Sequence, residues 1–248
     1  YYAEMNFTPE ILFENIREVR PTFLTAVPRI FEKIHAKILD SVSSMTGVKR
    51  KLADWSIAVG LQTVPYRQKS QDLPFMLGLK YKIADKLVLN KFRAALGGKV
   101  RACSSGGSAL SKEVGSFFCG IGITIIEGYG LTETSPVMTV GHTDFFKFGT
   151  VGKPIPGVEV KIQPDGEIVC RGHNVMMGYY KNEEATNEAI IDGWFHSGDI
   201  GEFDEDGLLR ITDRKKSLIV TSGGKNVAPQ PMEVSLTSNK YIEQCNIV

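Results

Sequence analysis

The segment Glu127–Thr134, with the sequence Glu-Gly-Tyr-Gly-Leu-Thr-Glu-Thr, places an aromatic ring, hydroxyls and a carboxylate close together. Its two glycines flank the tyrosine, and glycine allows a tight turn and close approach of a ligand to the backbone. The tyrosine ring offers a flat face for a base or another ring. The threonine and glutamate oxygens suit a phosphate and a hard cation such as Mg²⁺. These residues also fit an ordinary glycine-rich loop, and the segment alone leaves both interpretations open.

A buried strand is predicted before this segment, because Ile121–Ile126 is an apolar run of strand length. A second candidate loop, Ser104–Leu110, follows a predicted strand at Lys99–Cys103 and leads to a helix that Ser111 would cap. The loop is polar and holds two glycines, but it lacks the Gly-Lys-Ser/Thr of a Walker loop. Strands joined by one helix in a parallel sheet end at the same edge. The two loops together therefore predict a nucleotide cleft.

Composition excludes some classes of function. The chain has 248 residues, enough for one large domain or two smaller ones. Its 29 Lys and Arg residues balance 28 Asp and Glu residues, which does not indicate a nucleic-acid binder. No ligand spacing relates the four histidines, so we expect no structural zinc. Without a C-x-x-C pair, the cysteines are expected to be reduced thiols, three of them in apolar surroundings; they are Cys103, Cys119, Cys170 and Cys245.

Alternating helix and strand signals in the amino-terminal part predict a parallel α/β arrangement. The expected elements are a helix at Pro9–Val19, a strand at Thr22–Val27, a longer helix from Pro28, and helical stretches at Lys51–Lys69 and Phe75–Leu96. The helix from Pro28 carries an apolar stripe near a basic run, Lys49–Lys51, which raises a membrane-surface role. An ordinary half-buried helix is the favoured interpretation.

Short strands and turns follow Gly149 and predict a small antiparallel β unit. Within it, Asp199 lies between glycines, where its two oxygens could match a ribose diol. In isolation, a turn aspartate that binds its own backbone is the favoured interpretation. The charged segment Asp213–Lys216 follows a predicted strand at Leu208–Thr212. It fits either a solvated charged turn or a hinge whose arginine reaches an anionic ligand.

We therefore expect an α/β fold: a parallel-sheet portion, a small antiparallel β unit, and the beginning of a small α+β carboxyl-terminal domain. The predicted divisions are 1–149, 150–212 and 213–248. Apolar runs of only strand length predict no transmembrane segment, and we expect a cytoplasmic location, with peripheral membrane contact left open. The missing initiator Met and the pattern that continues to Val248 suggest a piece of a longer protein.

Taken in order, five motifs resemble those of the adenylate-forming enzymes, the superfamily of acyl-CoA synthetases, luciferases and peptide-synthetase adenylation domains. The motifs are Ser105–Leu110, Gly128–Thr134, His196–Asp199, Asp213–Lys216 and Gly223–Pro229. The segment Phe23–Ile34 is similar to the long-chain fatty acyl-CoA synthetase branch in particular.

This resemblance implies a two-step ligase. A fatty carboxylate attacks the α-phosphate of Mg·ATP to give acyl-AMP and pyrophosphate, and the thiol of coenzyme A then attacks the mixed anhydride. The implied cofactors are ATP/AMP, Mg²⁺ and coenzyme A, with a fatty acid as substrate. Adenylation of another acid (aryl, amino or shorter acyl) and a non-catalytic nucleotide-binding module stay open as alternatives.

The resemblance also implies roles for individual residues on the nucleotide side. Two glycines would line the adenine pocket, and the tyrosine would stack on the base; the implied contacts are Gly106, Gly107, Ser108, Tyr129 and Gly130. Two further glycines, Gly223 and Gly224, would lie near the path of the pantetheine arm.

The implied catalytic set is Thr132, Glu133 and Arg214. Thr132 would hydrogen-bond the α-phosphate, Glu133 would hold Mg²⁺, and Arg214 would contact ribose or phosphate. Asp199 would take the ribose hydroxyls, and Asp213 would be a hinge. The superfamily's loop for the β- and γ-phosphates, its upstream histidine motif and its distal lysine do not occur in this sequence. We therefore expect this chain alone to be nearly or fully inactive.

Overall fold

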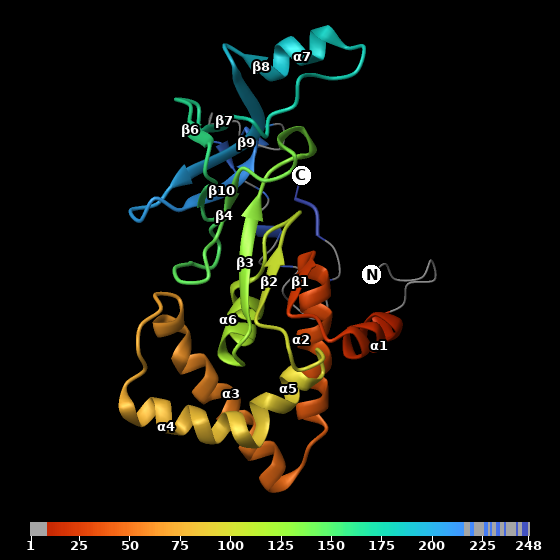
Figure 1. Ribbon diagram of the computed structural model, residues 1–248, viewed down its shortest axis with the longest axis vertical. Helices are drawn as coiled ribbons and strands as arrows, with labels where there is room; N and C mark the ends of the chain where they lie inside the picture. Colours follow the sequence, from red (N-terminus) through yellow and green to blue (C-terminus); the bar gives the residue numbers. More distant parts are fainter. Residues whose placement is uncertain are drawn as a thin grey trace. The chain divides into compact units, whose positions relative to one another are not determined.

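The chain divides into two compact units in the computed structural model (Figure 1). The structure describes residues 9–215, 219–220, 226–227, 229, 232–233, 236, 242 and 245–247. The first unit comprises Tyr1–Ile126 and His142–Phe148, and the second comprises Glu127–Gly141 and Gly149–Val248. The division passes through one strand, β3 (Thr124–Tyr129).

Helices and a parallel strand pair build the first unit. Its strands β1 (Phe23–Ala26) and β2 (Ala102–Ser105) pair in parallel, with Phe23 opposite Ala102, and β3 is next in the sheet order. This confirms the predicted parallel α/β portion. Its helical elements are α1 (Pro9–Val19), α2 (Pro28–Ser43), α3 (Gly47–Arg67), α4 (Phe75–Ala84), the π-helical turn η1 (Asp85–Leu89), α5 (Asn90–Ala94) and α6 (Lys112–Gly120).

Local sequence signals explain several of these boundaries. The α2 helix begins at Pro28, whose fixed φ suits the first helical position. The α6 helix is capped as predicted, because the Ser111 hydroxyl accepts a hydrogen bond from the backbone N–H of Val114. Its apolar face contributes Phe118, which is fully buried against Phe31 with the rings edge to face at 5.7 Å.

The strand predicted at Ile121–Ile126 is displaced, since β3 begins only at Thr124. Gly122 adopts a φ of +91°, and the N–H groups of Gly122 and Ile123 bond the carbonyls of Cys119 and Phe118. The first isoleucines of the run thus belong to the turn that ends α6, and they are apolar because they are buried there. The strand predicted at Lys99–Cys103 is likewise shifted to β2, two to three residues later.

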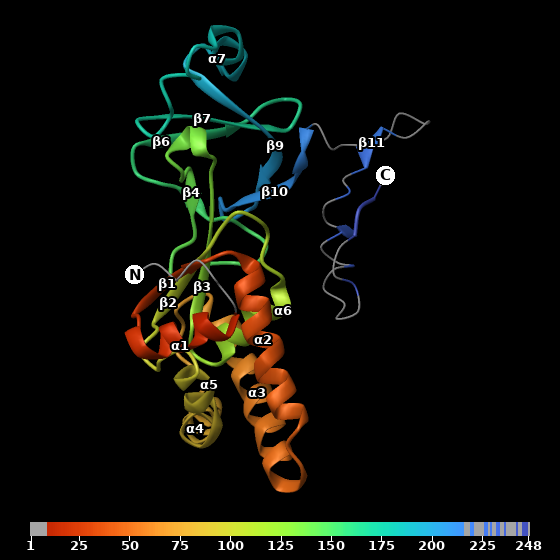
Figure 2. The same ribbon diagram turned by 90° about the vertical axis from the view of Figure 1, so that its right-hand side faces the viewer.

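Antiparallel strands dominate the second unit, as predicted. Their sheet runs in the order β10-β9-β7-β6, with β8 beside β9. Figure 2 shows β9 between β7 and β10. The elements are the 3₁₀ turn η2 (Thr132–Thr134), β4 (Thr139–Val140), β5 (Lys153–Pro154), β6 (Val158–Ile162), β7 (Glu167–Gly172), α7 (Glu183–Ala189), β8 (Ile190–Ile191), β9 (Trp194–Phe203), β10 (Leu209–Arg214), β11 (Ile219–Val220) and β12 (Asn226–Val227).

Two polar candidates lie within strands of this unit, where the sequence had suggested turns. Asp199 is inside β9, and Arg214 ends β10, directly opposite it in the antiparallel register. The ladder shifts between Ile211 and Asp213, so β10 continues past the predicted end at Thr212. Pairing with a long neighbouring strand therefore extends β10 into a segment without apolar residues.

Two further expectations concern the chain as a whole. Among the described helices, none combines the length and apolar content that crossing a bilayer requires. The four cysteines are free thiols, and Cys103, Cys119 and Cys170 are buried as expected. Burial raises the pKa of Cys103 to about 12.

Candidate functional site

Three of the predicted residues meet in the second unit where β3, β9 and β10 end or pair. The Tyr129 hydroxyl donates a hydrogen bond of 2.7 Å to Oδ2 of Asp199. On the other side of the same carboxylate, Nε of Arg214 lies 3.4 Å from Oδ1. Asp199 is buried, whereas the Arg214 side chain is 72% exposed. The carboxylate is thus oriented by two partners, and the guanidinium extends toward solvent.

A serine within β9 holds the backbone beside this cluster in place. The Ser197 hydroxyl donates to the carbonyl of Ile168 at 2.6 Å and accepts the N–H of Asp199 at 3.1 Å. Burial raises the pKa of Tyr129 far above its ordinary value; a hydrogen bond with Ser197 opposes this shift, and Asp199 adds to it. The phenol therefore stays protonated near neutral pH and remains a donor to Asp199.

Glu167 was not among the predicted residues, yet it anchors the segment that carries Asp199. Its buried carboxylate accepts the N–H of Gly198 at 3.0 Å and lies 3.0 Å from Nδ1 of His196 and from Nζ of Lys215. Burial alone would raise the pKa of Glu167, but hydrogen bonds from His196, Lys215 and the Gly198 N–H outweigh it and hold that pKa below its ordinary value. Glu167 is therefore ionised and links β7 to β9 and to Lys215, which directly follows β10.

The sequence offered only a faint signal for Glu167. It follows the predicted turn at Pro164–Gly166 and takes the first position of β7, where a glutamate resembles a solvent-facing strand residue. Its partners His196 and Lys215 are distant in sequence, and only the strand order β10-β9-β7 brings them together. Lys215 also bonds Asp165 at 2.7 Å.

The segment after Tyr129 forms a tight turn, as its glycines suggested. A Cβ on Gly130 would overlap the carbonyl oxygen of Pro136, so only glycine fits there. Thr134 is buried and accepts the N–H of Leu131 through its hydroxyl at 2.9 Å, which closes the turn η2. Thr132 is exposed on this turn.

Glu133 has a partner that sequence reasoning also missed. Its Oε1 accepts a hydrogen bond of 2.9 Å from the Tyr179 hydroxyl, and its backbone carbonyl accepts the N–H of Met176 at 2.8 Å. The bond to Glu133 raises the pKa of Tyr179. A carboxylate held in this way next to an exposed threonine hydroxyl offers oxygen ligands only. That is the donor chemistry that Mg²⁺ prefers, with substrate phosphates as its further ligands.

Other predicted residues belong to the first unit or fall outside the described residues. Gly106, Gly107 and Ser108 form the loop after β2 in the first unit, with Gly107 at a φ of +87°. A common cleft formed by this loop and the Tyr129 turn stays a prediction. Gly223 and Gly224 lie outside the described residues.

Asp213, the predicted hinge, is 1% exposed. Its Oδ1 accepts the N–H of Arg214 at 2.6 Å, while Oδ2 has no hydrogen-bond partner among the described residues. A buried carboxylate oxygen without a partner is costly, which makes Asp213 an unusual occupant of a strand. A hinge at Asp213 stays a prediction.

Comparison with known proteins places these residues in context. A family model described as AMP-binding enzyme matches residues 1–180. The long-chain fatty acid–CoA ligase FadD15 of Mycobacterium bovis is 43% identical over 249 aligned residues, which cover 98% of this chain and 40% of that protein. The long-chain fatty acid–CoA ligase ACSBG2 of Xenopus laevis is 40% identical over 94% of this chain and 32% of its own length. The chain thus spans about two fifths or less of these relatives.

Solved structures share the fold. The o-succinylbenzoate coenzyme A synthetase of Bacillus subtilis, in complex with its acyl-adenylate intermediate, superimposes with a TM-score of 0.66 at 22% identity, over 97% of this chain and 40% of that one. The amide bond synthetase McbA of Marinactinospora thermotolerans gives 0.63 at 21% identity, over 98% of this chain and 41% of that one. At such low identity the likeness concerns the fold alone.

Proposed function

The chain belongs to the AMP-binding enzyme family, and on this premise we propose that it forms part of an ATP-dependent long-chain fatty acid–CoA ligase. The observation that carries this proposal is the 43% identity to the mycobacterial long-chain ligase across nearly the whole chain. The cluster of the buried Tyr129 and Asp199 with the exposed Arg214 supports the nucleotide side of the proposal.

In the proposed enzyme, Asp199 binds the two ribose hydroxyls of ATP through its carboxylate. Tyr129 and Arg214 already hold this carboxylate from both sides, so it loses little freedom on binding. The exposed guanidinium of Arg214 contacts ribose or the α-phosphate. Glu167 acts one step further away, because it fixes the backbone of Gly198 next to Asp199.

Thr132 and Glu133 are proposed on the phosphate side. Thr132 donates its hydroxyl hydrogen bond to an α-phosphate oxygen, where negative charge builds up as the fatty carboxylate attacks. Mg²⁺ at Glu133 would neutralise charge on the triphosphate and its leaving pyrophosphate. The Tyr179 hydroxyl orients the Glu133 carboxylate for this role.

The remaining assignments complete the proposal. Gly106, Gly107 and Ser108 in the first unit, together with Gly130, contact the nucleotide, and Gly223 and Gly224 border the path of coenzyme A. We propose that the chain divides after residues 149 and 212. Asp213 is then the hinge between the second and third of these parts. The proposed location is the cytoplasm, which the four free cysteines support, and peripheral membrane contact is proposed with it.

ATP–pyrophosphate exchange with palmitate tests the proposal. A protein of the relatives' length that contains this chain should catalyse the exchange, and the 248-residue chain alone should not. In the longer protein, Glu133→Gln should lower the exchange rate roughly 100-fold, the usual size of losing one electrostatic contact to the transition state. Glu184→Gln is the matched control, because Glu184 is exposed on α7.

Different outcomes of the assay separate the proposal from its alternatives. Faster exchange with an aryl, amino or short acyl acid than with palmitate would contradict the proposed substrate class. It would still agree with the proposed adenylation reaction. Absence of exchange with every acid, with AMP binding retained, would favour a non-catalytic nucleotide-binding module. Strong exchange by the 248-residue chain would contradict the expectation that this chain alone is inactive and would show that the catalytic roles are wrongly assigned.

A further inference from the structure

A row of large apolar side chains is exposed on α4 and on the η1 turn that follows it. Phe75, Leu79, Ile83 and Leu87 recur at every fourth residue, a spacing that keeps them on one side of a helix. All four are exposed, and Phe75 is 82% exposed. We name these four residues the α4 stripe. A contiguous apolar surface of this kind is typical of a contact with a partner or a membrane.

The opposite side of α4 already has its partner. The Tyr81 ring lies under the guanidinium of Arg67 on α3, with 4.7 Å between the guanidinium carbon and the ring centroid. Ala84 is fully buried, and Leu77 packs against the core of the unit. The helix is thus apolar on both sides, and its packing in the first unit uses only one of them.

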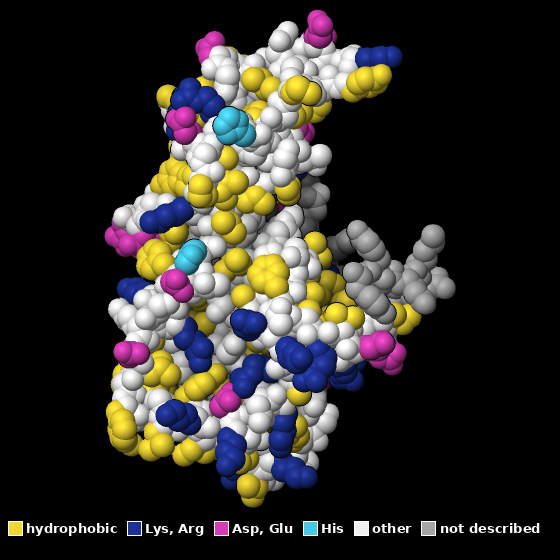
Figure 3. All heavy atoms as spheres, viewed as in Figure 1, with side chains coloured by type: hydrophobic (Ala, Val, Ile, Leu, Met, Phe, Trp, Pro, Cys, Tyr) yellow, Lys and Arg dark blue, Asp and Glu magenta, His cyan; other side chains and the backbone are white. Residues whose placement is uncertain are grey.

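The α4 stripe differs from the stripe for which the sequence raised a membrane-surface role. On α2, Phe31, Ile34, Ile38 and Val42 are buried in the core, as in an ordinary half-buried helix. The α4 stripe lies on the outside instead. In Figure 3, hydrophobic and basic side chains share the lower left part of the molecule, where Figure 1 places α4.

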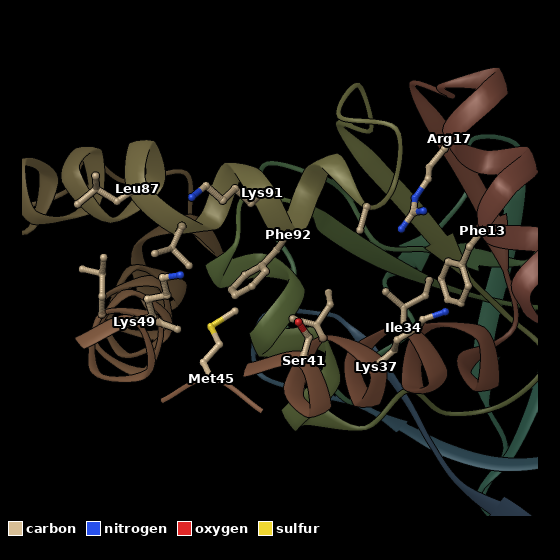
Figure 4. A pocket seen from close by; sticks show the side chains of 15 residues that line it. Phe13, Arg17, Ile34, Lys37, Ser41, Met45, Lys49, Leu87, Lys91 and Phe92 are labelled. Atoms are coloured by element: carbon tan, nitrogen blue, oxygen red, sulfur yellow. The ribbon is translucent and has the colours of Figure 1, made fainter. Parts of the chain in front are cut away.

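The α4 stripe is also separate from the apolar pocket of the first unit. This pocket of about 440 Å³ lies between α1, α2, α3 and the η1–α5 segment (Figure 4). Leu87 lines one end of it, whereas Phe75, Leu79 and Ile83 do not line it. None of the residues assigned above to nucleotide, metal or coenzyme A belongs to α4 or η1. The stripe is therefore an outer surface and no part of the candidate site.

Three lysines accompany the α4 stripe. Lys80, Lys82 and Lys86 are exposed, and none of them has an ion-pair partner among the residues that the structure describes. Asp85, the one acid of α4 and η1, is held by Arg93 at 2.6 Å. Lysine side chains can lie along an apolar surface and keep the ammonium group at its border. This side of α4 therefore presents apolar side chains together with positive charge.

We propose that the α4 stripe docks on the surface of a lipid bilayer that contains anionic lipids. The apolar side chains enter the boundary between head groups and acyl chains, and the lysines meet the head-group phosphates. Two copies of the chain joined through this surface would gather the lysines of both copies, and like charges oppose that. The inference rests on the peripheral membrane contact proposed above, and it names the surface and the lipid charge that make this contact.

Sedimentation with vesicles tests the proposal on a protein of the relatives' length that contains this chain. Vesicles of phosphatidylcholine with phosphatidylglycerol should bind the protein, and vesicles of phosphatidylcholine alone should bind it roughly tenfold more weakly or less. The triple variant Phe75→Gln/Leu79→Gln/Ile83→Gln should weaken binding to the anionic vesicles roughly tenfold or more, because it removes the side chains that enter the bilayer.

The matched control for this variant changes three exposed apolar residues of the same unit outside α4 and η1. It is Val19→Gln/Leu39→Gln/Val48→Gln, and it should bind the anionic vesicles like the parent protein. Equal losses in the α4 variant and in this control would overturn the proposal.

The lysines are tested separately. Lys80→Gln/Lys82→Gln/Lys86→Gln should reduce binding to the anionic vesicles to the level of phosphatidylcholine alone, because it removes the attraction to the head groups. The control removes the same charge at exposed positions of the same unit, and it should retain most of the binding; it is Lys33→Gln/Lys99→Gln/Lys112→Gln. Equal losses in these two variants would show that net charge attracts the vesicles and would overturn the proposal.

Two readouts keep the outcomes distinguishable. Circular dichroism verifies the fold of each variant, and ATP–pyrophosphate exchange with palmitate, measured without vesicles, should be the same in the α4 variants and the parent protein. Absent exchange with retained vesicle binding would contradict the ligase proposal alone. Absent binding of the parent protein to anionic vesicles would overturn the docking proposal alone. A dimer of the parent protein that the Phe75/Leu79/Ile83 variant abolishes, without vesicle binding, would assign the α4 stripe to a second copy and overturn it as well.

Discussion

The two units of this chain differ in where their charged side chains lie, at the surface in one and partly in the interior in the other. In the first unit the interior is apolar apart from a few side chains such as His35, and the lysines that accompany the α4 stripe are exposed. In the second unit, charged side chains are buried in the interior. Every buried carboxylate among the described residues belongs to it: Glu127, Glu167, Asp199 and Asp213.

This difference shows what each unit is suited to bind. Burying a carboxylate is costly unless donors surround it, and the second unit provides those donors for Glu167 and Asp199. A fixed carboxylate then offers its remaining acceptor positions to a polar ligand. An apolar surface with exposed cations beside it favours a partner that carries the anions itself. The following variants test whether buried charge in the second unit is as costly to disturb as this contrast requires.

Removing the Glu167 carboxylate should have the largest effect. Glu167→Ala leaves the N–H of Gly198 and the ring of His196 without their acceptor, and we expect a loss of about 3 kcal/mol in the free energy of unfolding. Urea unfolding followed by the fluorescence of Trp194, in a Trp55→Phe background, measures it within the second unit.

The matched control for this change is Glu159→Ala. Glu159 forms an exposed ion pair with Arg171 at 2.8 Å on neighbouring strands of the same sheet. Surface pairs contribute roughly 0–1 kcal/mol, so this variant should unfold almost like the parent chain. Equal losses for the two glutamates would contradict the contrast between buried and exposed charge.

A glycine pair gives the next largest effect. Gly130→Ala forces a methyl group against the Pro136 carbonyl, and we expect a loss of about 2–3 kcal/mol through displaced backbone. Gly128→Ala is the control, because its Cβ would make only ordinary contacts, 3.5 Å from the Thr139 carbonyl oxygen. The measurement is again urea unfolding with Trp194 as reporter. A larger loss for Gly128→Ala would show that the η2 turn is not constrained as the structure indicates.

Tyr129→Phe should have a smaller effect of about 1–2 kcal/mol, since it removes one donor from a buried carboxylate that keeps Arg214. AMP affinity should fall together with stability if Asp199 binds ribose. Tyr180→Phe is the control, because the Tyr180 side chain is 87% exposed in the same unit and has no part in the proposed site. A stable Tyr129→Phe protein with unchanged AMP affinity would contradict the role given to this hydrogen bond.

Much of the fold could be predicted from local sequence. Pro9, Pro28 and Ser111 fixed helix starts, and the turn at Pro164–Gly166 lies between paired antiparallel strands as expected. These signals succeed because they act over a few residues. Ile121–Ile123 misled the prediction of β3, since burial at a helix end and burial in a strand select the same side chains.

The site was predictable only in part, for a related reason. Tyr129, Asp199 and Arg214 carried motif signals, and the structure brings them together. Glu167 belongs to no motif and carried only a faint signal, because its role depends on the order of strands and on partners many residues away. A residue that positions other side chains can be predicted from the sequence only when its partners are close to it in the sequence.

Mild acid should lower the stability of the first unit at a higher pH than that of the second unit. This is the smallest of the predicted effects. Burial lowers the pKa of His35 below its ordinary 6.5, and the nearby Glu113 carboxylate opposes this less strongly. The unfolded chain then takes the proton first. Stability that depends on neutral His35 is complete above pH 6.5 and is lost as the pH falls from there through the folded pKa. Glu167, with a pKa below 4.5, keeps its contribution until the pH falls below that value.

The chain has two tryptophans, and each unit holds one, Trp55 on α3 and Trp194 on β9. Unfolding free energies measured with each reporter alone should fall first for Trp55, beginning near pH 6.5, and only below about pH 4.5 for Trp194. His35→Phe keeps a ring against Phe117, 4.5 Å away between centroids in the parent chain, and removes the proton site. In that variant the Trp55 curve should stay flat between pH 6.5 and 5 while the Trp194 curve is unchanged. A common onset for both reporters in the parent chain would mean that acid acts on the two units through the same groups, and the contrast between them would fail.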